Sequence, residues 1–171
     1  NGTPLPVLAV DLNETLIRSD MLHESLWSAL ASHNGETLRA LTNFFKGKAA
    51  LKAALANNTT VNPASLPYDA RVLEEIELWR ERGGRVVLVT AANTKIAHSV
   101  ADHLGLFDDV PASGRDLNLK GSAKASFLVE TYGAHGFVYM GDSRSDLAVW
   151  SEAAGAITVD ARASVRAAVD R

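Results

Sequence analysis

Residues 7–20 read VLAVDLNETLIRSD, an apolar run followed directly by acidic and polar residues. The first four residues are apolar, and Val7 and Val10 are β-branched, which predicts a buried strand. Asp11 follows where that strand should end. Asn13 comes two residues later, at a place where a second carboxylate would complete a two-carboxylate site. The stretch therefore predicts a strand that leads into a functional site in which an amide replaces one carboxylate.

Three further apolar runs resemble the first, and helical patterns alternate with them. The runs are 85–89, 136–140 and 156–159, and the helical patterns are 69–82, 94–104, 121–132 and 146–154. Short continuous apolar runs are typical of parallel strands that are covered on both faces. Asp69 is the expected N-cap of the first helix and Gly83 its expected end. The alternation predicts an α/β fold, a doubly wound Rossmann-like parallel sheet with helices on both faces.

Residues 18–67 interrupt this alternation because they contain no strand candidate. The pattern there predicts helices near 21–32, 36–45 and 48–56, followed by a polar, proline-bearing return. We therefore divide the chain into a core of 1–17 and 68–171 and a small helical cap of 18–67. Ligands of such sheets bind beyond the carboxyl ends of the strands, so a cap inserted after the first strand is expected to roof the site.

Length and composition limit the classes of function that this chain can have. A length of 171 residues suits one domain with a small insertion. The absence of cysteine excludes disulfides and thiolate zinc sites, and a net charge of −3 does not favour nucleic acid or an anionic membrane as a partner. No apolar run approaches the roughly 20 residues of a membrane helix and no secretory signal is evident, so a cytoplasmic location is the expectation.

Polar side chains suited to a metal ion and a phosphate group follow the ends of the predicted strands. They are Asp11, Asn13, Thr90, Asp142 and Asp146, with Lys120 and Lys124 near the helix that leads into the third run. Carboxylate oxygens in this number suit Mg²⁺, which completes its shell with water and phosphate. A lysine facing the same point would neutralise an anion. Asp146 could instead be a helix N-terminal charge, and Thr90 a plain strand-end residue.

These residues resemble the four motifs of the haloacid dehalogenase (HAD) superfamily in order, spacing and position. The motifs are DLNETL at 11–16, Thr90 after an apolar run, Lys120 followed by Gly121, and GDSRSD at 141–146. The insertion after the first strand resembles the C1-type cap of phosphoserine-phosphatase-like members. The resemblance implies a Mg²⁺-dependent phosphatase that hydrolyses phosphate monoesters.

A narrower resemblance concerns HAD domains fused ahead of membrane prenyltransferases that join phosphoribose to a polyprenyl phosphate. It rests on four stretches: LIRSDMLHESLW at 16–27, LKAAL at 51–55, LPYDARVLEEI at 66–76 and NLKGSAKASFLVE at 118–130. It implies that the chain is part of a longer protein, and that its substrate is a small-molecule or lipid-linked phosphate ester, such as a phosphorylated pentose.

The family resemblance implies a role for each metal and nucleophile position. Asp11 would attack phosphorus and carry an aspartyl phosphate, with its other carboxylate oxygen on Mg²⁺. The backbone carbonyl of Asn13 and the carboxylate of Asp142 would also face the metal. Asp146 would bind it through water or orient the shell.

The resemblance also implies a phosphate-binding set. The Thr90 hydroxyl and the backbone N–H groups of Ala91, Leu12 and Asn13 would receive the phosphoryl oxygens. Lys120 would stabilise the nucleophile and the transferring group, as its place directly before a glycine suggests, whereas Lys124 could be a solvated helix residue. Asp20 and His23 in the cap and Arg144 in the last motif are candidates for substrate contact, although each also fits an ordinary structural or surface role.

Position 13 is where the sequence departs from the family, because phosphatases of this type carry a second aspartate there as general acid and base. Asparagine keeps the shape but has no titratable proton, and acid–base help is typically worth about 10²–10⁴-fold. We therefore expect binding of metal and phosphate with poor turnover. The intact remaining motifs favour an introduced, disabling change; the alternatives are a natural phosphotransferase and a non-hydrolytic binding or regulatory domain of a membrane prenyltransferase fusion.

Overall fold

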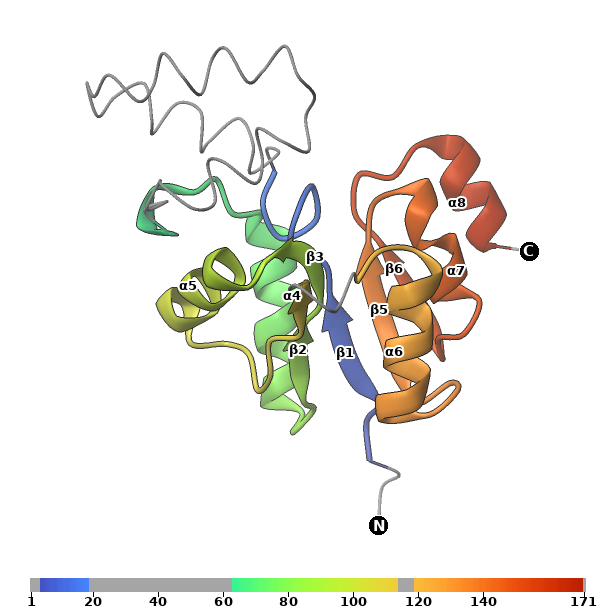
Figure 1. Ribbon diagram of the computed structural model, residues 1–171, viewed down its shortest axis with the longest axis horizontal. Helices are drawn as coiled ribbons and strands as arrows, with labels where there is room; N and C mark the ends of the chain where they lie inside the picture. Colours follow the sequence, from blue (N-terminus) through green and yellow to red (C-terminus); the bar gives the residue numbers. More distant parts are fainter. Residues whose placement is uncertain (1–3, 19–62, 114–118, 171) are drawn as a thin grey trace.

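The computed structural model describes residues 4–18, 63–113 and 119–170, and these residues form an α/β domain built on a parallel sheet (Figure 1). The sheet has four strands in the order β2-β1-β5-β6, and all neighbouring strands are parallel. Their bounds are Val7–Val10 (β1), Val86–Leu88 (β2), Phe137–Gly141 (β5) and Gly155–Thr158 (β6). A separate parallel pair consists of β3 (Thr90–Asn93) and β4 (Ala112–Ser113).

Helices cover both faces of this sheet, which confirms the doubly wound fold. On one face, Leu8 and Val10 pack in a core with side chains of α4 (Ala70–Glu81) and α5 (Thr94–Leu104). On the other face, Ala9 and Tyr139 pack with α6 (Ser122–Tyr132), α7 (Leu147–Trp150) and α8 (Ala163–Val169). Side chains alternate between faces along a strand, so β1 contributes to both cores and lies at the centre of the domain.

The ends of α4 follow from its sequence, as predicted. The side chain of Asp69 accepts a hydrogen bond from the backbone N–H of Arg71 and so caps the first turn. At the other end the backbone N–H of Gly83 donates to the carbonyl of Arg80, and that of Gly84 to the carbonyl of Trp79. This is a Schellman arrangement, and it requires the positive φ of 78° at Gly83, which glycine adopts without steric cost.

Two predicted elements differ in extent from the observed ones. The strand predicted at 85–89 is limited to β2, with β3 beginning at Thr90. The helix predicted at 146–154 becomes a 3-10 turn, η2 (Arg144–Asp146), followed by α7, which ends at Trp150. The helix ends early because the backbone N–H of Ala154 already donates to the carbonyl of Phe137 at 2.7 Å, which commits that segment to the next strand.

The two chain segments that flank residues 19–62 lie side by side. The N–H of Arg18 donates to the carbonyl of Pro67 at 3.0 Å, and the N–H of Asp69 donates to that of Leu16 at 2.9 Å. A short 3-10 helix, η1 (Pro63–Ser65), lies at the start of the second segment. The predicted cap, with its candidate contacts Asp20 and His23, lies almost wholly outside the described residues and stays a prediction. In the portions of the chain that the structure describes, no helix has the length and apolar character needed to cross a membrane.

Candidate active site

The candidate site lies at the carboxyl end of β1, where the order of the sheet reverses direction. The chain runs from β1 to its neighbour β2 on one side and later returns to β5 on the other side. Loops diverge at such a switch point, and ligands of open parallel sheets bind in the resulting crevice. Asp11 is the first residue after β1, and its backbone N–H donates to the carbonyl of Met140 at 3.0 Å. The sheet itself therefore holds the backbone of Asp11 at the base of the crevice.

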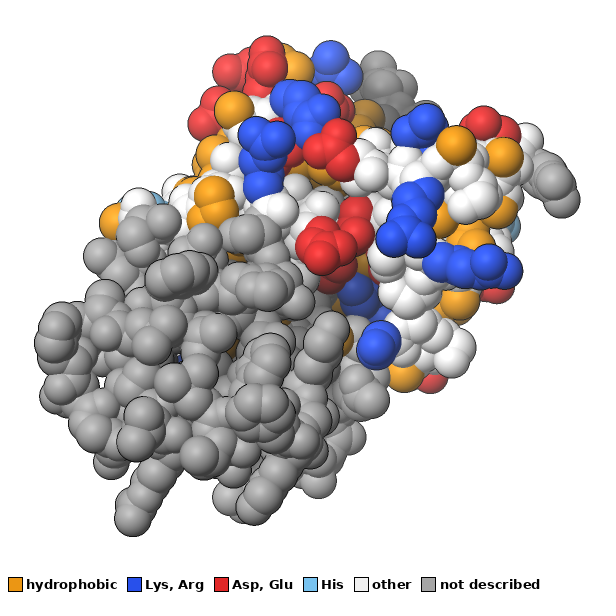
Figure 2. All heavy atoms as spheres, turned by 90° about the horizontal axis from the view of Figure 1, so that it is seen from above, with side chains coloured by type: hydrophobic (Ala, Val, Ile, Leu, Met, Phe, Trp, Pro, Cys, Tyr) orange, Lys and Arg blue, Asp and Glu red, His pale blue; other side chains and the backbone are white. Residues whose placement is uncertain are grey.

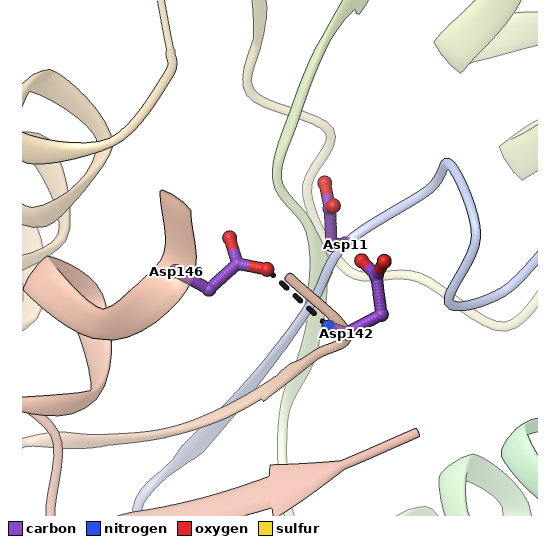
Figure 3. Close-up of side chains that lie close together, drawn as sticks. All are labelled: Asp11, Asp142 and Asp146. Carbon is purple, nitrogen blue, oxygen red and sulfur yellow. Dashed lines mark hydrogen bonds between the residues drawn. The ribbon is translucent and has the colours of Figure 1, made fainter. Parts of the chain in front are cut away.

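Three carboxylates meet at this point (Figure 3). Asp11 comes from β1, Asp142 directly follows β5, and Asp146 ends the 3-10 turn η2. One oxygen of each lies within 4.8 Å of the others. These carboxylates, which the sequence placed at separate strand ends, are brought together as expected and offer a set of hard oxygen ligands.

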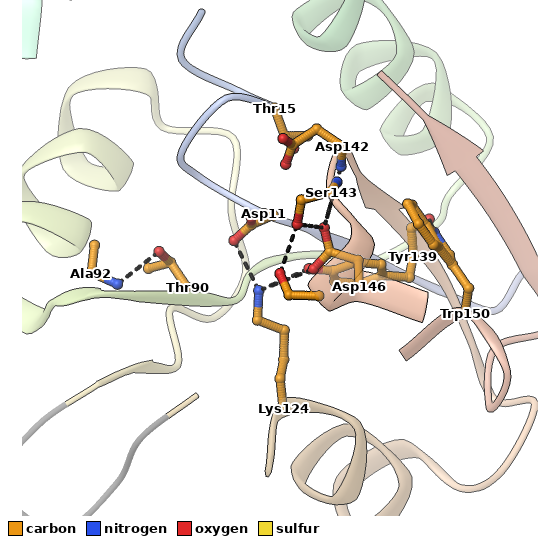
Figure 4. A network of polar contacts seen from close by, with 11 residues as sticks. Asp11, Thr15, Thr90, Ala92, Lys124, Tyr139, Asp142, Ser143, Asp146 and Trp150 are labelled. Atoms are coloured by element: carbon orange, nitrogen blue, oxygen red, sulfur yellow. Dashed lines mark hydrogen bonds and ion pairs between the residues drawn. The ribbon is translucent and has the colours of Figure 1, made fainter. Parts of the chain in front are cut away.

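Asp146 is held by several donors from its own loop and from β5 (Figure 4). Its Oδ2 accepts hydrogen bonds from the backbone N–H of Asp142 at 3.3 Å, and from the N–H and the hydroxyl of Ser143, both at 3.1 Å. Its Oδ1 accepts from the hydroxyl of Tyr139 at 2.9 Å. Since the side chain is only 2% exposed, these donors replace the water that a buried carboxylate would otherwise lack.

Lys124, and not Lys120, contacts Asp11. Lys124 Nζ lies 2.9 Å from Asp11 Oδ1, and this lysine is 3% exposed. Lys120 is exposed and lines the mouth of the same pocket, but it makes no ion pair with any residue in the described parts of the chain. The structure therefore places Lys124 beside Asp11, and the predicted role of Lys120 stays a prediction. Lys124 is the third residue of α6 and shares that helix's buried face with Ala125 and Leu128, which turns its side chain toward the sheet.

Burial and mutual repulsion raise the pKa values of two of the carboxyl groups. The pKa of Asp142 rises to about 7, chiefly because burial disfavours its charged form and then because the charges of Asp11 and Asp146 repel it. A hydrogen bond from the hydroxyl of Thr15, at 3.2 Å, opposes this rise. The pKa of Asp11 is also raised by burial, against the attraction of Lys124. Such crowded acids are stable together only when a cation or a proton offsets their charge.

The residues predicted to bind a phosphoryl group border this cluster. Thr90 is fully buried, and its Oγ1 accepts from the backbone N–H of Ala92 at 3.0 Å. The hydroxyl can still donate its own proton to a ligand. Thr90 and Ala91 line the pocket together with Asn13, and the side chain of Leu12 is buried beneath it. The side-chain Oδ1 of Asn13 is buried without a hydrogen-bond partner among the described residues.

The pocket between these residues has a volume of about 250 Å³ and opens to the surface. Figure 2 looks onto this face and shows acidic side chains at its centre, with lysine and arginine side chains beside them. Ser143 and Ser145 contribute to the pocket wall, whereas Arg144 between them is exposed and is not part of the lining. The predicted substrate contact of Arg144 therefore stays a prediction.

Sequence reasoning missed two residues of this site, Tyr139 and Thr15. Tyr139 was only one member of an apolar run, yet its hydroxyl joins Lys124 to Asp146. Thr15 stands in the first motif, and its hydroxyl reaches Asp142 across 127 residues of sequence. A usable signal existed for Tyr139, because a buried tyrosine normally has a partner for its hydroxyl. No local pattern predicts the pairing of Thr15.

Comparisons with known proteins agree with the geometry. A family model described as haloacid dehalogenase-like hydrolase matches residues 8–150. "Uncharacterized protein y4nM" of Sinorhizobium fredii (strain NBRC 101917 / NGR234) is 44% identical over 155 residues, which are 91% of this chain and 30% of that protein. The chain thus spans less than a third of the length of this curated relative.

Solved structures share the fold at low sequence identity. A substrate-bound phosphoserine phosphatase complex matches with a TM-score of 0.66 and 16% identity, covering 99% of this chain and 92% of that one. A protein of unknown function from Bordetella pertussis Tohama I matches with a TM-score of 0.70 and 15% identity, over 98% and 96% of the two chains. The family match covers most of the chain and includes the carboxylate cluster, and the chain therefore belongs to the haloacid dehalogenase-like hydrolases.

Proposed function

We propose that this domain is a Mg²⁺-dependent phosphatase that acts on phosphate monoesters through an aspartyl phosphate on Asp11. The observation that carries the proposal is the meeting of Asp11 with a buried lysine and two further carboxylates at a pocket wall. Phosphoryl transfer needs mainly a positioned nucleophile and compensation of negative charge. The family match and the shared fold with a phosphoserine phosphatase support this chemistry.

The carboxylate cluster fits a magnesium ion. Carboxylate oxygens are the ligands that Mg²⁺ prefers, and three of them lie within 4.8 Å of one another. Both oxygens of Asp146 already accept hydrogen bonds from the protein, so Asp11 and Asp142 would hold the ion directly and Asp146 through water. The backbone carbonyl of Asn13 is the further proposed ligand. When bound, the ion supplies positive charge beside the phosphoryl oxygens.

In the proposed reaction, each of these residues has a separate role. A carboxylate oxygen of Asp11 forms a bond to phosphorus while the bond to the ester oxygen breaks, and the Lys124 ammonium stabilises the charge. The hydroxyl of Thr90 and the N–H groups of Leu12, Asn13 and Ala91 receive the phosphoryl oxygens. A water molecule then attacks phosphorus, which releases inorganic phosphate and restores the carboxylate.

Asn13 limits both steps, because it can neither give a proton to the leaving oxygen nor take one from the attacking water. The leaving oxygen must take its proton from solvent, so turnover is expected to be about 10²–10⁴-fold below that of an aspartate at this position. The Oδ1 of Asn13 has no partner among the described residues, so it is free to accept a hydrogen bond from a ligand or water in the pocket. An aspartate in the genomic sequence would show that the change was introduced.

The second candidate function is a non-hydrolytic phosphate-ligand or regulatory domain within a longer protein. One observation favours it: the S. fredii relative is more than three times as long as the matched region. An asparagine that is natural at position 13 would disable hydrolysis but not binding. The resemblance to domains fused to membrane prenyltransferases belongs to this proposal, with a lipid-linked phosphopentose as the ligand. Phosphotransfer to an acceptor other than water is the third possibility.

The decisive experiment measures phosphate release from a panel of monoesters, including phosphorylated pentoses, with Mg²⁺. The chain is compared with its Asn13→Asp and Asp11→Asn variants. A gain of about 10²-fold or more in Asn13→Asp, absent from the Asp11→Asn form of that variant, supports the phosphatase. Saturable Mg²⁺ and phosphate binding without turnover in Asn13→Asp supports the binding domain. Failure of every variant to bind Mg²⁺ would refute both proposals.

A further inference from the structure

We propose that Tyr139 is a positioning residue, whose hydroxyl holds the Lys124 ammonium on Asp11 and keeps it off Asp146. This inference deepens the proposed function and depends on it for its kinetic consequence, but its geometric part can be tested without any turnover. Tyr139 lies in β5, three residues before Asp142, and it belongs to none of the motifs that identify the family. Its hydroxyl stands between the only buried lysine of the described residues and a carboxylate of the metal cluster.

The direction of each hydrogen bond follows from the groups involved. Lys124 Nζ lies 2.8 Å from the Tyr139 hydroxyl, and that hydroxyl lies 2.9 Å from Asp146 Oδ1. An ammonium can only donate, so the phenolic oxygen accepts from Lys124 and uses its single proton to donate to Asp146. One hydroxyl therefore satisfies a cation on one side and an anion on the other, a relay that no other side chain of similar shape could provide.

The distances show what this relay prevents. Lys124 Nζ is 2.9 Å from Asp11 Oδ1 but 4.0 Å from Asp146 Oδ1 (Figure 4). At the lower dielectric of a buried site both carboxylates attract the ammonium strongly. The phenolic oxygen is within hydrogen-bond distance of both groups, so each has the hydroxyl as its near partner and the direct ion pair between Lys124 and Asp146 stays long. Without the hydroxyl, the ammonium loses one acceptor and Asp146 Oδ1 loses its donor, so the two groups would gain by moving together at the expense of Asp11.

Tyr139 is itself fixed well enough to act as such a spacer. It is 0% exposed, and its ring meets that of Trp150 edge-on at 6.0 Å between centroids. The indole N–H of Trp150 donates to the backbone carbonyl of Tyr139 at 3.0 Å, which ties the helix α7 to β5 at this residue. The backbone of Tyr139 pairs with Ala9 of β1 on one side and Ala156 of β6 on the other. A strand residue held on both edges and packed by an aromatic ring can set a distance reliably.

The kinetic test uses the Asn13→Asp form, in which turnover is expected to be measurable. Tyr139→Phe removes only the hydroxyl, and Tyr132→Phe, near the end of α6, is the matched control. We expect kcat to fall about 10- to 100-fold in Tyr139→Phe, the effect of losing one charge-assisted hydrogen bond, while KM changes by less than about threefold. In a Lys124→Gln background the same change should have no further effect on kcat. Equal losses with and without Lys124 would overturn the proposal, because Tyr139 would then act independently of the lysine.

The second test observes the lysine directly and needs no substrate. In ¹⁵N-lysine-labelled protein, the signal assigned to Lys124 by its loss in Lys124→Gln is compared between the parent, Tyr139→Phe and Tyr132→Phe. We expect a changed Nζ shift and faster exchange of the ammonium protons with water in Tyr139→Phe alone, with all variants melting cooperatively. An unchanged Lys124 signal in folded Tyr139→Phe would refute the positioning role. If no variant turns over any ester but the signal moves, the phosphatase proposal fails and the role of Tyr139 stands.

Discussion

The raised pKa of Asp142 makes a quantitative prediction about metal binding by this protein. With a pKa of about 7, Asp142 is largely protonated in mildly acidic solution, whereas an ordinary aspartate with a value of 3.8 is not. The proposed Mg²⁺ would bind the charged carboxylate and so would compete with this proton. Since the charged form grows as the pH rises through 7, the apparent affinity for Mg²⁺ should rise over the same range and level off above it.

The size of the effect follows from one competing proton. Between about pH 8 and about pH 5.5 a group with a pKa of about 7 weakens the apparent affinity about 30-fold, whereas a group at 3.8 would leave it nearly unchanged. The pKa of Asp11 is raised as well, so proton uptake there can only make the dependence steeper. Near pH 6 about 0.9 proton should leave Asp142 for each Mg²⁺ bound.

Titration calorimetry in two buffers of different ionisation enthalpy measures both the affinity and the released protons. Thr15→Val is the sharpest comparison, because it removes the hydrogen bond that lowers the pKa of Asp142 and should shift the midpoint to higher pH. Asp142→Asn should abolish most binding, yet raise the melting temperature of the metal-free protein at alkaline pH by removing a repelled charge. An Mg²⁺ affinity that stays flat between about pH 8 and about pH 5.5 would show that Asp142 is not a titrating ligand.

Two further predictions concern the lysines and the cap of α4. In the Asn13→Asp form, Lys124→Gln should lower kcat by about 10²-fold or more, because it removes the ammonium beside Asp11, the proposed nucleophile. Lys120→Gln should leave kcat within about threefold, and comparable losses in the two variants would contradict this difference. Asp69→Ala should cost about 1–2 kcal/mol of unfolding free energy, measured by urea denaturation, and Asp69→Asn less, because asparagine is also a good N-cap. Equal stability of Asp69→Ala and the parent would contradict the capping role.

The free energy of unfolding at acid pH should also depend on the charge of Asp69. Its contact with Arg71 lowers its pKa from 3.8 to about 2 in the folded protein, so the stabilisation is complete above pH 3.8 and is lost as the pH falls toward 2. This effect has the opposite sign to that of Asp142, whose raised pKa makes the metal-free fold less stable as the pH rises from 3.8 to about 7, above which the loss is complete.

The architecture and the meeting of the carboxylates could be predicted from the amino-acid sequence. Apolar runs of strand length alternating with amphipathic helices require a sheet covered on two sides, because no other arrangement buries both faces of each strand. Polar residues directly after such strands must then meet at one edge. Asp11, Asp142 and Asp146 do so, within 4.8 Å. The two ends of α4 could likewise be predicted from the sequence, because the caps at Asp69 and Gly83 depend only on neighbouring residues.

The identity of the lysine that contacts Asp11, and of the groups that hold this lysine, depends on the packing of the whole domain. Lys120 and Lys124 are four residues apart, but Lys120 precedes α6, whereas Lys124 lies inside it on the face toward the sheet. That choice depends on where the helix begins and on its rotation against β1 and β5, which are set by packing in the whole domain. The hydroxyl of Tyr139 and that of Thr15 find charged partners for the same reason: their contacts join residues distant in sequence, and only the folded chain brings them within hydrogen-bond distance.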